Sequence, residues 1–352
     1  MILAACALAL LAQAPHKPDD FLRIEKVAPG VYTAVRNEPP GLAVDCNVTF
    51  IINDDDVIVV DANIGPESAS ATIRALKKLT NKPVSMLINT HYHDDHIGGN
   101  STFKAAYPGI KFVAHKSTED NIQKYAVASR KSMIETAPQM TRFLHMLIDK
   151  KKGYSGEPIT DEERNAYLND IRIADRYSKE MPAVKFTPPD ILVDDQLTLH
   201  RGKRTIEIRY LGAGHTGSDL VVWMPQDDVL VAGDLVVWPI PLIGSPQSNM
   251  KQWPVTLQAL LDLGPAAIVP GHGAIMRGGG FVEALIRMFN SINKQVGEGV
   301  ARGDKLEDLQ KSIDLSEFER GLVGSSHLRK TLFDLYCREP AISESYAEQT
   351  AK

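Results

Sequence analysis

A histidine-rich segment, HYHDDH at positions 91–96, follows directly behind an apolar run at residues 84–89. An apolar run of this length, flanked by polar residues, is typical of a buried strand. Imidazole nitrogens and carboxylate oxygens are the ligands that zinc prefers, and crowding them at one strand end costs free energy unless a cation binds. Since the chain has only ten histidines in all, three within six positions favour a metal site over a surface cluster.

Three further candidate ligands follow later strand-like runs. His215 lies in GAGHTG, Asp234 follows the run VLVAG, and His272 lies in PGHG. A single Gly-His or Gly-Asp step is typical of a turn, but the three together predict loops that gather at the ligand-binding edge of a sheet. Four other histidines match no motif and are interpreted as ordinary surface or core residues: His115, His145, His200 and His327.

The periodicity of apolar residues predicts a mixed α/β chain with two β-rich halves. The expected strands are 31–36, 47–53, 57–61, 84–89, 191–199, 205–211, 219–224, 229–232 and 267–270, and the expected helices between them are 66–79 and 253–263. The polar segment 117–185 predicts an insertion of two or three helices, with a capping box at Thr160 and Glu163. Beyond Gly280 we expect helices only, with a second capping box at Ser316 and Glu319.

Over residues 31–275 the pattern resembles the metallo-β-lactamase superfamily: a strand-end aspartate, then HxHxDH, then a separated His, Asp and His. Asp61, in VVDAN, matches the first of these elements. The resemblance implies an αββα sandwich, with two sheets face to face and the site at one edge. The implied organisation is a signal peptide (1–14), an N-terminal linker (15–30), a catalytic domain (31–280) containing the helical insertion, and a C-terminal helical extension (281–352).

The resemblance also assigns the ligands. It implies that His91, His93 and His215 hold one metal, that Asp95, His96 and His272 hold a second, and that Asp234 bridges the two. Asp61 would accept hydrogen bonds that fix the ligand loop. We expect two zinc ions, with iron or manganese as alternatives.

Two divalent ions that share a water lower its pKa from about 15.7 towards about 7, so a bridging hydroxide exists at neutral pH. One metal would polarise the carbonyl or phosphoryl oxygen of the substrate. The hydroxide would then attack the adjoining carbon or phosphorus. Asp95 is the candidate to orient the nucleophile or to pass a proton to the leaving group. No serine or cysteine nucleophile is needed.

The expected substrate is a small ester, thioester, lactone or amide. True class B β-lactamases usually carry Cys or Ser near the position of Asp234, so antibiotic hydrolysis is not the leading hypothesis, although weak β-lactamase activity stays an alternative. A second alternative is an iron-dependent, persulfide dioxygenase-like oxidoreductase. A net charge of −5 gives no excess of cations for a nucleic-acid surface, so we expect a small-molecule partner. The sequence does not indicate an oligomeric state.

The first fourteen residues are apolar and end in Ala12-Gln13-Ala14, which predicts a signal peptide and export to the periplasm or the medium. A lipid anchor at Cys6 is the alternative. No later apolar run reaches the roughly 18 residues of a membrane span, so we do not expect the mature protein to insert stably into a membrane. Its cysteines, Cys46 and Cys337, are expected as buried thiols, with a disulfide as the alternative.

The loop at residues 238–244, WPIPLIG, is too apolar for a free surface loop. It follows Asp234 closely in the chain. Two interpretations stay open: the loop lines an apolar mouth of the site, or it packs beneath the helical additions.

Overall fold

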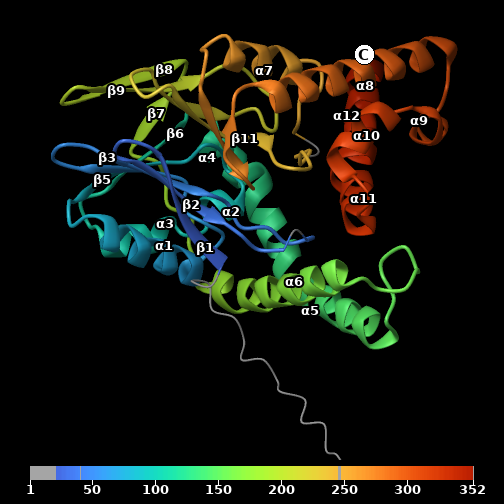
Figure 1. The fold of residues 1–352 in the computed structure, drawn as a ribbon, viewed down its shortest axis with the longest axis horizontal. Coiled ribbons are helices and arrows are strands. Elements are labelled where there is room, and N and C mark those ends of the chain that lie inside the picture. Colours follow the sequence, from blue (N-terminus) through green and yellow to red (C-terminus); the bar gives the residue numbers. More distant parts are fainter. Residues whose placement is uncertain (1–20, 40, 245–246, 352) are drawn as a thin grey trace, which may run out of the picture.

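The computed structural model describes residues 21–39, 41–244 and 247–351, and in that part of the chain two β-sheets lie face to face between layers of helices (Figure 1). This confirms the αββα sandwich. The first sheet runs in chain order: β1 (Leu22–Ala28), β2 (Val31–Arg36), β3 (Val48–Ile52), β4 (Val57–Val60), β5 (Val84–Ile88), β6 (Lys111–His115) and β7 (Ile191–Val193). The second sheet has the order β13 (Met276–Arg277), β12 (Ala267–His272), β11 (Val229–Val237), β10 (Leu220–Met224), β9 (Arg204–Tyr210) and β8 (Gln196–Arg201).

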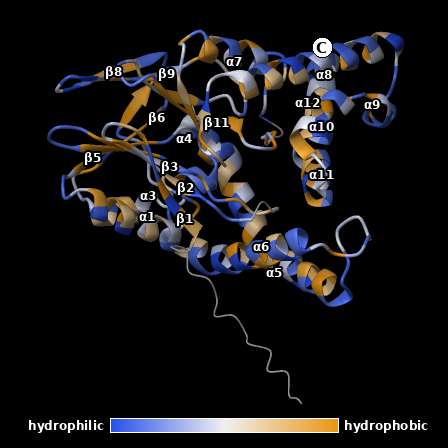
Figure 2. Ribbon diagram, viewed as in Figure 1, coloured by the Kyte–Doolittle hydropathy of each residue, from blue (hydrophilic) through white to orange (hydrophobic). Residues whose placement is uncertain are grey.

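The two-residue alternation of the strands builds the layers. In β4, Ile58 and Val60 point between the sheets, whereas Val57 and Val59 point outward against the helices. The central strands of both sheets are buried on both faces, which explains why they are apolar throughout. Figure 2 shows this apolar interior, with polar residues on the outer helix faces.

Helices cover the outer face of each sheet. The first sheet is covered by α1 (Pro66–Leu79), while the short α2 (Asp94–Ile97) and α3 (Asn100–Ala106) follow β5. The second sheet is covered by α7 (Trp253–Leu261) and α8 (Gly280–Arg302). Trp253 and Phe289 pack together on this second face, with ring centroids 4.9 Å apart.

The helical insertion and the C-terminal helices extend from the same side of the sandwich (Figure 1). The insertion contains α4 (Thr118–Asn121), the π-helical turn η2 (Ile122–Ala126), α5 (Val127–Lys150), α6 (Asp161–Glu180) and the short η3 (Met181–Ala183). The C-terminal part contains α9 (Leu306–Ser312), α10 (Ser316–Val323), α11 (His327–Phe333), η4 (Asp334–Arg338) and α12 (Glu339–Thr350).

One of the two expected capping boxes forms. At the start of α6, Thr160 and Glu163 bond each other's backbone N–H groups, as expected. The prediction of a second capping box, at Ser316 and Glu319, is wrong. Ser316 is already the first residue of α10, and its N–H donates to Asp314 Oδ1 at 2.9 Å, so the side chain two positions earlier supplies the acceptor.

Several strand assignments differ from expectation. Residues 22–28, expected within a linker, form β1, which pairs antiparallel with β2. The single strand expected at 191–199 is two strands, β7 and β8, in different sheets. The adjacent Asp194 and Asp195 separate them, because the chain must leave one sheet and enter the other there. β6 and β13 were also not expected, and β11 continues to Val237, so Asp234 lies within a strand and not in the expected loop.

Cys46 and Cys337 are both buried and both free. They lie in separate hydrophobic clusters, on the outer faces of different sheets. The expectation of two buried thiols is confirmed, and the alternative of a disulfide between them is wrong. The expected signal peptide and the alternative anchor at Cys6 lie outside the described residues. Within the described residues, no helix combines the length and the apolar composition that a membrane crossing requires.

Candidate metal centre

The fold brings all the candidate ligands to one edge. Asp61 directly follows β4, and the 91–96 segment follows its parallel neighbour β5, so the carboxyl ends of both strands meet there. The parallel pair β11 and β12 supplies Asp234 and His272. Two groups result, each with its ligand atoms within 4.8 Å of one another: His91, His93 and His215 in the first group, and Asp95, His96, Asp234 and His272 in the second.

The second group has the spacing of a tetrahedral zinc site. Its two histidine Nε2 atoms, of His96 and His272, lie 3.3 Å apart. Each lies 3.1 to 3.4 Å from a carboxylate oxygen of Asp95 and of Asp234. Ligands at about 2.0–2.1 Å from a tetrahedral ion lie about 3.3 Å from each other, so these side chains fit such an ion without rearrangement.

The carboxylate of Asp234 faces both groups at once. Its Oδ1 lies 3.2 Å from His96 Nε2, while its Oδ2 lies 3.5 Å from His215 Nε2. The side chain is only 2 % exposed. A carboxylate with one oxygen towards each group has the geometry of a bridging ligand.

The first group is a set of three edge-packed imidazoles. His93 Nδ1 lies 3.0 Å from His215 Nε2, and the ring of His91 lies 4.7 Å and 4.9 Å from the rings of these two. His91 Nε2 is buried and, within the described part of the chain, has no hydrogen-bond partner. A buried polar atom without a partner is costly, and a metal ion at the centre of this group would supply one.

The nitrogens that face away from the centre are held by hydrogen bonds. His215 Nδ1 bonds the carbonyl oxygen of Leu242 at 2.8 Å, and His272 Nδ1 bonds that of Asp45 at 3.1 Å. A carbonyl accepts only from an N–H, so each Nδ1 carries the proton and each Nε2 is directed inward. Such bonds fix the tautomer and the orientation of a metal-binding imidazole.

Asp61 holds the start of the ligand segment. Its carboxylate accepts from Thr90 N at 2.8 Å and from Thr90 Oγ1 at 2.9 Å, and it lies 2.9 Å from His96 Nδ1. Its backbone has φ of +65°, a conformation that aspartate tolerates better than most residues. Thr90 also bonds His91 Nδ1 at 3.1 Å, so one threonine connects two candidate ligands to Asp61.

Burial and charge divide the imidazoles into two kinds. Burial lowers the pKa of His91, and it lowers the pKa of His93 to about 3, so both rings are neutral. Burial acts in the same direction on His272, but the carboxylates of Asp234 and Asp95 raise its pKa to about 10. The second group therefore has an excess of negative charge, which a proton or a metal cation can balance.

Glycines give the ligands room at two points. A Cβ on Gly271 would lie 1.8 Å from Asp234 Oδ1, and a Cβ on Gly244 would lie 2.7 Å from the backbone oxygen of His215. Neither contact is sterically possible. The close approach of the Asp234 carboxylate therefore requires glycine at position 271, directly before His272.

The sequence reasoning missed several residues that support the site. Asp219 accepts from Thr216 N at 2.8 Å and from Thr216 Oγ1 at 2.6 Å, which fixes the loop next to His215. Burial raises the pKa of Asp219 to about 7. A Thr-x-x-Asp spacing at a strand start was the only signal for this pair, and it is common in turns that bind nothing.

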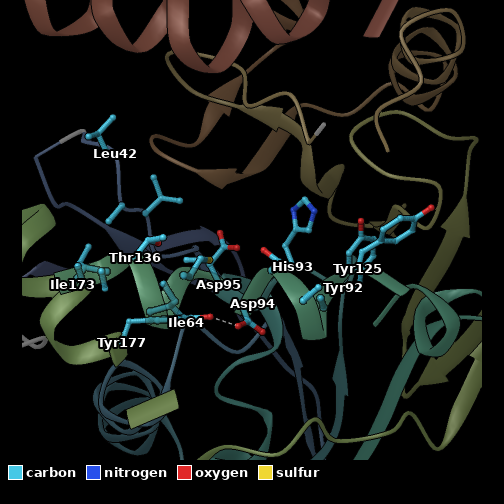
Figure 3. Close-up of a pocket in the computed structure, with 18 of the residues that line it drawn as sticks. Leu42, Ile64, Tyr92, His93, Asp94, Asp95, Tyr125, Thr136, Ile173 and Tyr177 are labelled. Atoms are coloured by element: carbon cyan, nitrogen blue, oxygen red, sulfur yellow. Dashed lines mark hydrogen bonds between the residues drawn. The ribbon is translucent and has the colours of Figure 1, made fainter. Parts of the chain in front are cut away.

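A cavity of about 710 Å³ opens beside the ligands. Figure 3 shows His93 and Asp95 at its edge, with Ile64, Thr136 and Ile173 on its other walls. More than half of its lining comes from η2, α5 and α6, so the insertion forms a wall of the cavity, and that wall is mainly apolar.

The apolar loop at 238–244 packs beneath the helical additions, and part of it lines a separate cavity next to one candidate ligand. Ile240 and Ile243 are buried against the C-terminal helices. Trp238 and Leu242 line a second, smaller cavity of about 270 Å³, which His272 also lines. Trp238 is 39 % exposed, so this side of the loop stays open to solvent.

The sequence profile described as the metallo-beta-lactamase superfamily matches residues 41–272. The chain belongs to this superfamily. The match begins before the first candidate ligand and ends on His272, so it covers the whole of the metal centre. It confirms the resemblance, and the His/Asp cluster at this edge of the sandwich is suited to metal.

Two curated relatives illustrate the range of the superfamily. The chain is 25 % identical over 254 residues to metallo-beta-lactamase IND-1 of Chryseobacterium indologenes, a match that covers 71 % of this chain and 80 % of the relative. It is 23 % identical over 244 residues to a linear primary-alkylsulfatase of Pseudomonas sp., which covers 66 % of this chain but only 42 % of the relative. The chain therefore spans less than half the length of that alkylsulfatase.

Solved structures show the same fold. The sec-alkylsulfatase Pisa1 from Pseudomonas sp. aligns with a TM-score of 0.67 over 94 % of this chain and 50 % of its own, at 15 % identity. A metallo-beta-lactamase from Pontibacter korlensis aligns with a TM-score of 0.54 over 76 % of this chain and 99 % of its own, at 17 % identity.

Proposed function

We propose that the protein is a dinuclear, zinc-dependent hydrolase acting on a small ester, thioester, lactone or amide. One observation carries the proposal: Asp234 directs one carboxylate oxygen towards each of two ligand groups. The residues assigned as ligands are His91, His93 and His215 for one ion and Asp95, His96 and His272 for the other, with Asp234 shared.

Two bound zinc ions would supply an acidified water as nucleophile and a Lewis acid for the substrate oxygen. The side chains hold this geometry through their hydrogen bonds, described above. Asp95 faces both the ligand group and the cavity, with its side chain 17 % exposed. Although burial acts against it, the neighbouring His96 and His272 hold the pKa of Asp95 well below its usual range. Asp95 is thus an anion at neutral pH, placed at the cavity edge to accept a hydrogen bond from the nucleophile and orient it.

The lining of the larger cavity favours a substrate with an apolar group. Met133, Ala137 and Met140 from α5 and Ile173 and Ala174 from α6 all line it. A polar, hydrolysable bond would lie at the metals while an acyl or alkyl chain extends between these helices. A cavity of about 710 Å³ has room for a chain of this kind.

Hydrolysis of an alkyl sulfate ester is a second candidate. It is favoured by the same apolar wall and by the names of two relatives, a primary-alkylsulfatase and a sec-alkylsulfatase. Lys124 is a cation on the cavity lining. It would attract the anionic head group of such a substrate towards the metals.

The test is a panel assayed on the zinc-loaded protein: p-nitrophenyl acetate and octanoate, a thioester, a lactone, a cephalosporin, dodecyl sulfate and bis(p-nitrophenyl) phosphate. We expect the carboxylic esters to be cleaved, with octanoate preferred to acetate. Release of sulfate from dodecyl sulfate with no ester cleavage would support the second candidate instead. Turnover of none of the panel would contradict the proposal.

Export to the periplasm or the medium belongs to the same proposal. It rests on the apolar start of the sequence and is tested by determining the N-terminal residue of the protein purified from its host. A first residue close to Pro15 supports export. A protein that retains Met1 contradicts it.

A further inference from the structure

Asp94 stands between two candidate ligands, His93 and Asp95, yet its side chain belongs to another network. Arg130 of α5 donates two parallel hydrogen bonds to the Asp94 carboxylate, from Nε to Oδ2 at 2.7 Å and from Nη2 to Oδ1 at 2.5 Å. The two side chains are 8 % and 9 % exposed. A buried, bidentate pair of this kind is both strong and geometrically specific.

A second helix reaches the same carboxylate. Tyr177 of α6 donates its hydroxyl to Asp94 Oδ2, the bond drawn in Figure 3. Asp94 therefore ties both long helices of the insertion to the metal-binding segment at a single point.

Arg130 itself is held from other directions. Its Nη1 donates to the backbone oxygen of Val184 at 2.9 Å, and its guanidinium lies 3.6 Å from the ring centroid of Phe186. Phe186 belongs to the segment that returns from the insertion to the sheet. The guanidinium is consequently fixed in orientation as well as in charge.

This network faces the substrate cavity. Asp94 and Tyr177 line it beside Asp95, and Met133, Ala137 and Met140, further along the helix that carries Arg130, line its wall. The distance between wall and ligands depends on where α5 and α6 are held. A second contact of α6 reaches a different loop: the carboxylate of Asp170 accepts hydrogen bonds from the backbone N–H groups of residues 42 and 43.

We infer that Asp94, Arg130 and Tyr177 form a latch that positions the helical wall relative to the metal ligands and thereby sets specificity for the apolar part of the substrate. Asp94 is a positioning residue in this account: it acts through the helices and through the ligand segment that it shares with His93 and Asp95. The kinetic part of the inference rests on the proposed hydrolase function, whereas the positioning itself does not.

The experiment compares Arg130→Met, which removes the charge and the fork, with Arg130→Lys, which keeps the charge, and Tyr177→Phe, which removes one hydroxyl. Each variant is assayed for kcat/KM on p-nitrophenyl octanoate and acetate, and for metal content. Binding of 11-(dansylamino)undecanoic acid is titrated by fluorescence on the metal-free protein, so this readout needs neither metal nor turnover.

We expect Arg130→Met to lower the octanoate-to-acetate ratio of kcat/KM by about tenfold or more, mainly through a higher KM for octanoate. The affinity for the dansyl probe should fall by a similar factor. Arg130→Lys should fall between this variant and the wild type. Tyr177→Phe should shift both readouts in the same direction by a smaller factor.

Asp227→Asn is the matched control. It removes the charge of Asp227, which pairs with Arg204 at a distance of 2.8 Å between Arg204 Nε and Asp227 Oδ2. This pair is buried to a similar degree but does not line the cavity. This variant should lose thermal stability and keep both the ester ratio and the affinity for the probe.

A folded Arg130→Met protein with the wild-type ester ratio and wild-type probe affinity overturns the inference. Equal losses on both esters with unchanged probe affinity overturn it as well, because they would assign the pair to the metal site alone. If the wild type cleaves neither ester, the proposed substrate class fails, and the dansyl probe still decides whether the latch positions the wall.

Discussion

Replacing Asp61 by asparagine tests how the ligand segment is held. The side chain keeps its shape, and asparagine tolerates the φ of +65° at this position. The amide oxygen can still accept from Thr90 N, which lies 2.8 Å from the present carboxylate. The amide NH2 then faces His96 Nδ1, where a carboxylate oxygen now lies at 2.9 Å. A donor opposite the Nδ1–H removes that hydrogen bond.

The expected magnitude follows from the lost contact with His96, because Thr90 Oγ1 keeps an acceptor in the amide oxygen, whose present position lies 3.1 Å away. A hydrogen bond to a charged group contributes about 1.5–3 kcal/mol, and a free-energy change of about 1.4 kcal/mol is tenfold in an equilibrium constant. His96 must then be oriented by the metal alone. We therefore expect the ion held by the second ligand group to bind about 10- to 100-fold more weakly.

The assay is a competitive titration of zinc against a chromophoric chelator at fixed pH. In the Asp61→Asn protein one of two binding steps should weaken and the other should stay near its wild-type value. Asp228→Asn is the matched control, because Asp228 also has positive φ, +50°, and lies in a turn between β10 and β11. The control should bind both ions as the wild type does.

A folded Asp61→Asn protein that binds both ions with wild-type affinity would refute this reasoning. It would mean that the bond between Asp61 and His96 does not hold a metal ligand. Equal weakening of both steps would also contradict it, since His96 belongs to one group only.

Four further outcomes are expected. Asp234→Ala should abolish turnover and lose about one metal per chain while the protein stays folded, measured by elemental analysis and circular dichroism. Gly271→Ala should lose metal as well, because its Cβ would lie 1.8 Å from Asp234 Oδ1. Thr160→Ala should lower the free energy of unfolding by about 1 kcal/mol in a denaturant titration and leave metal content unchanged, since it removes a helix cap far from the ligands. Burial raises the pKa of Asp170 from 3.8 to about 6, so the folded state binds this proton more tightly than the unfolded state does. As the pH falls from 7 to 4, the free energy of unfolding of the wild type should therefore rise by up to about 2–3 kcal/mol relative to that of Asp170→Asn. A difference between these two proteins that does not change with pH would contradict that assignment.

The sequence predicted the sandwich because its core strands carry the signal themselves. Runs such as VIVV in β4 and VSMLI in β5 are apolar on both faces, and helical spacing marks α1 clearly. β1 was missed because its residues, LRIEKVA, are mostly half-exposed at the edge of a sheet, where polar and apolar side chains mix.

The candidate ligands could be found because metal chemistry concentrates rare residue types at fixed spacings. Their supporting contacts could not. Arg130 is 36 positions from Asp94, and Tyr177 is 83 positions away, so nothing local in the sequence relates them. Arginine and tyrosine are also frequent in any surface helix, and only the packing of α5 and α6 against the ligand segment shows which of them are buried.

The central claim is that two metal ions share Asp234, and the metal content of protein purified without added metal tests it most directly. Elemental analysis should find close to two zinc ions per chain in the wild type and about one in Asp234→Ala. One iron per chain with little zinc would contradict the account and favour the oxidoreductase alternative. Two tightly held ions in the Asp234→Ala protein would contradict the bridging role.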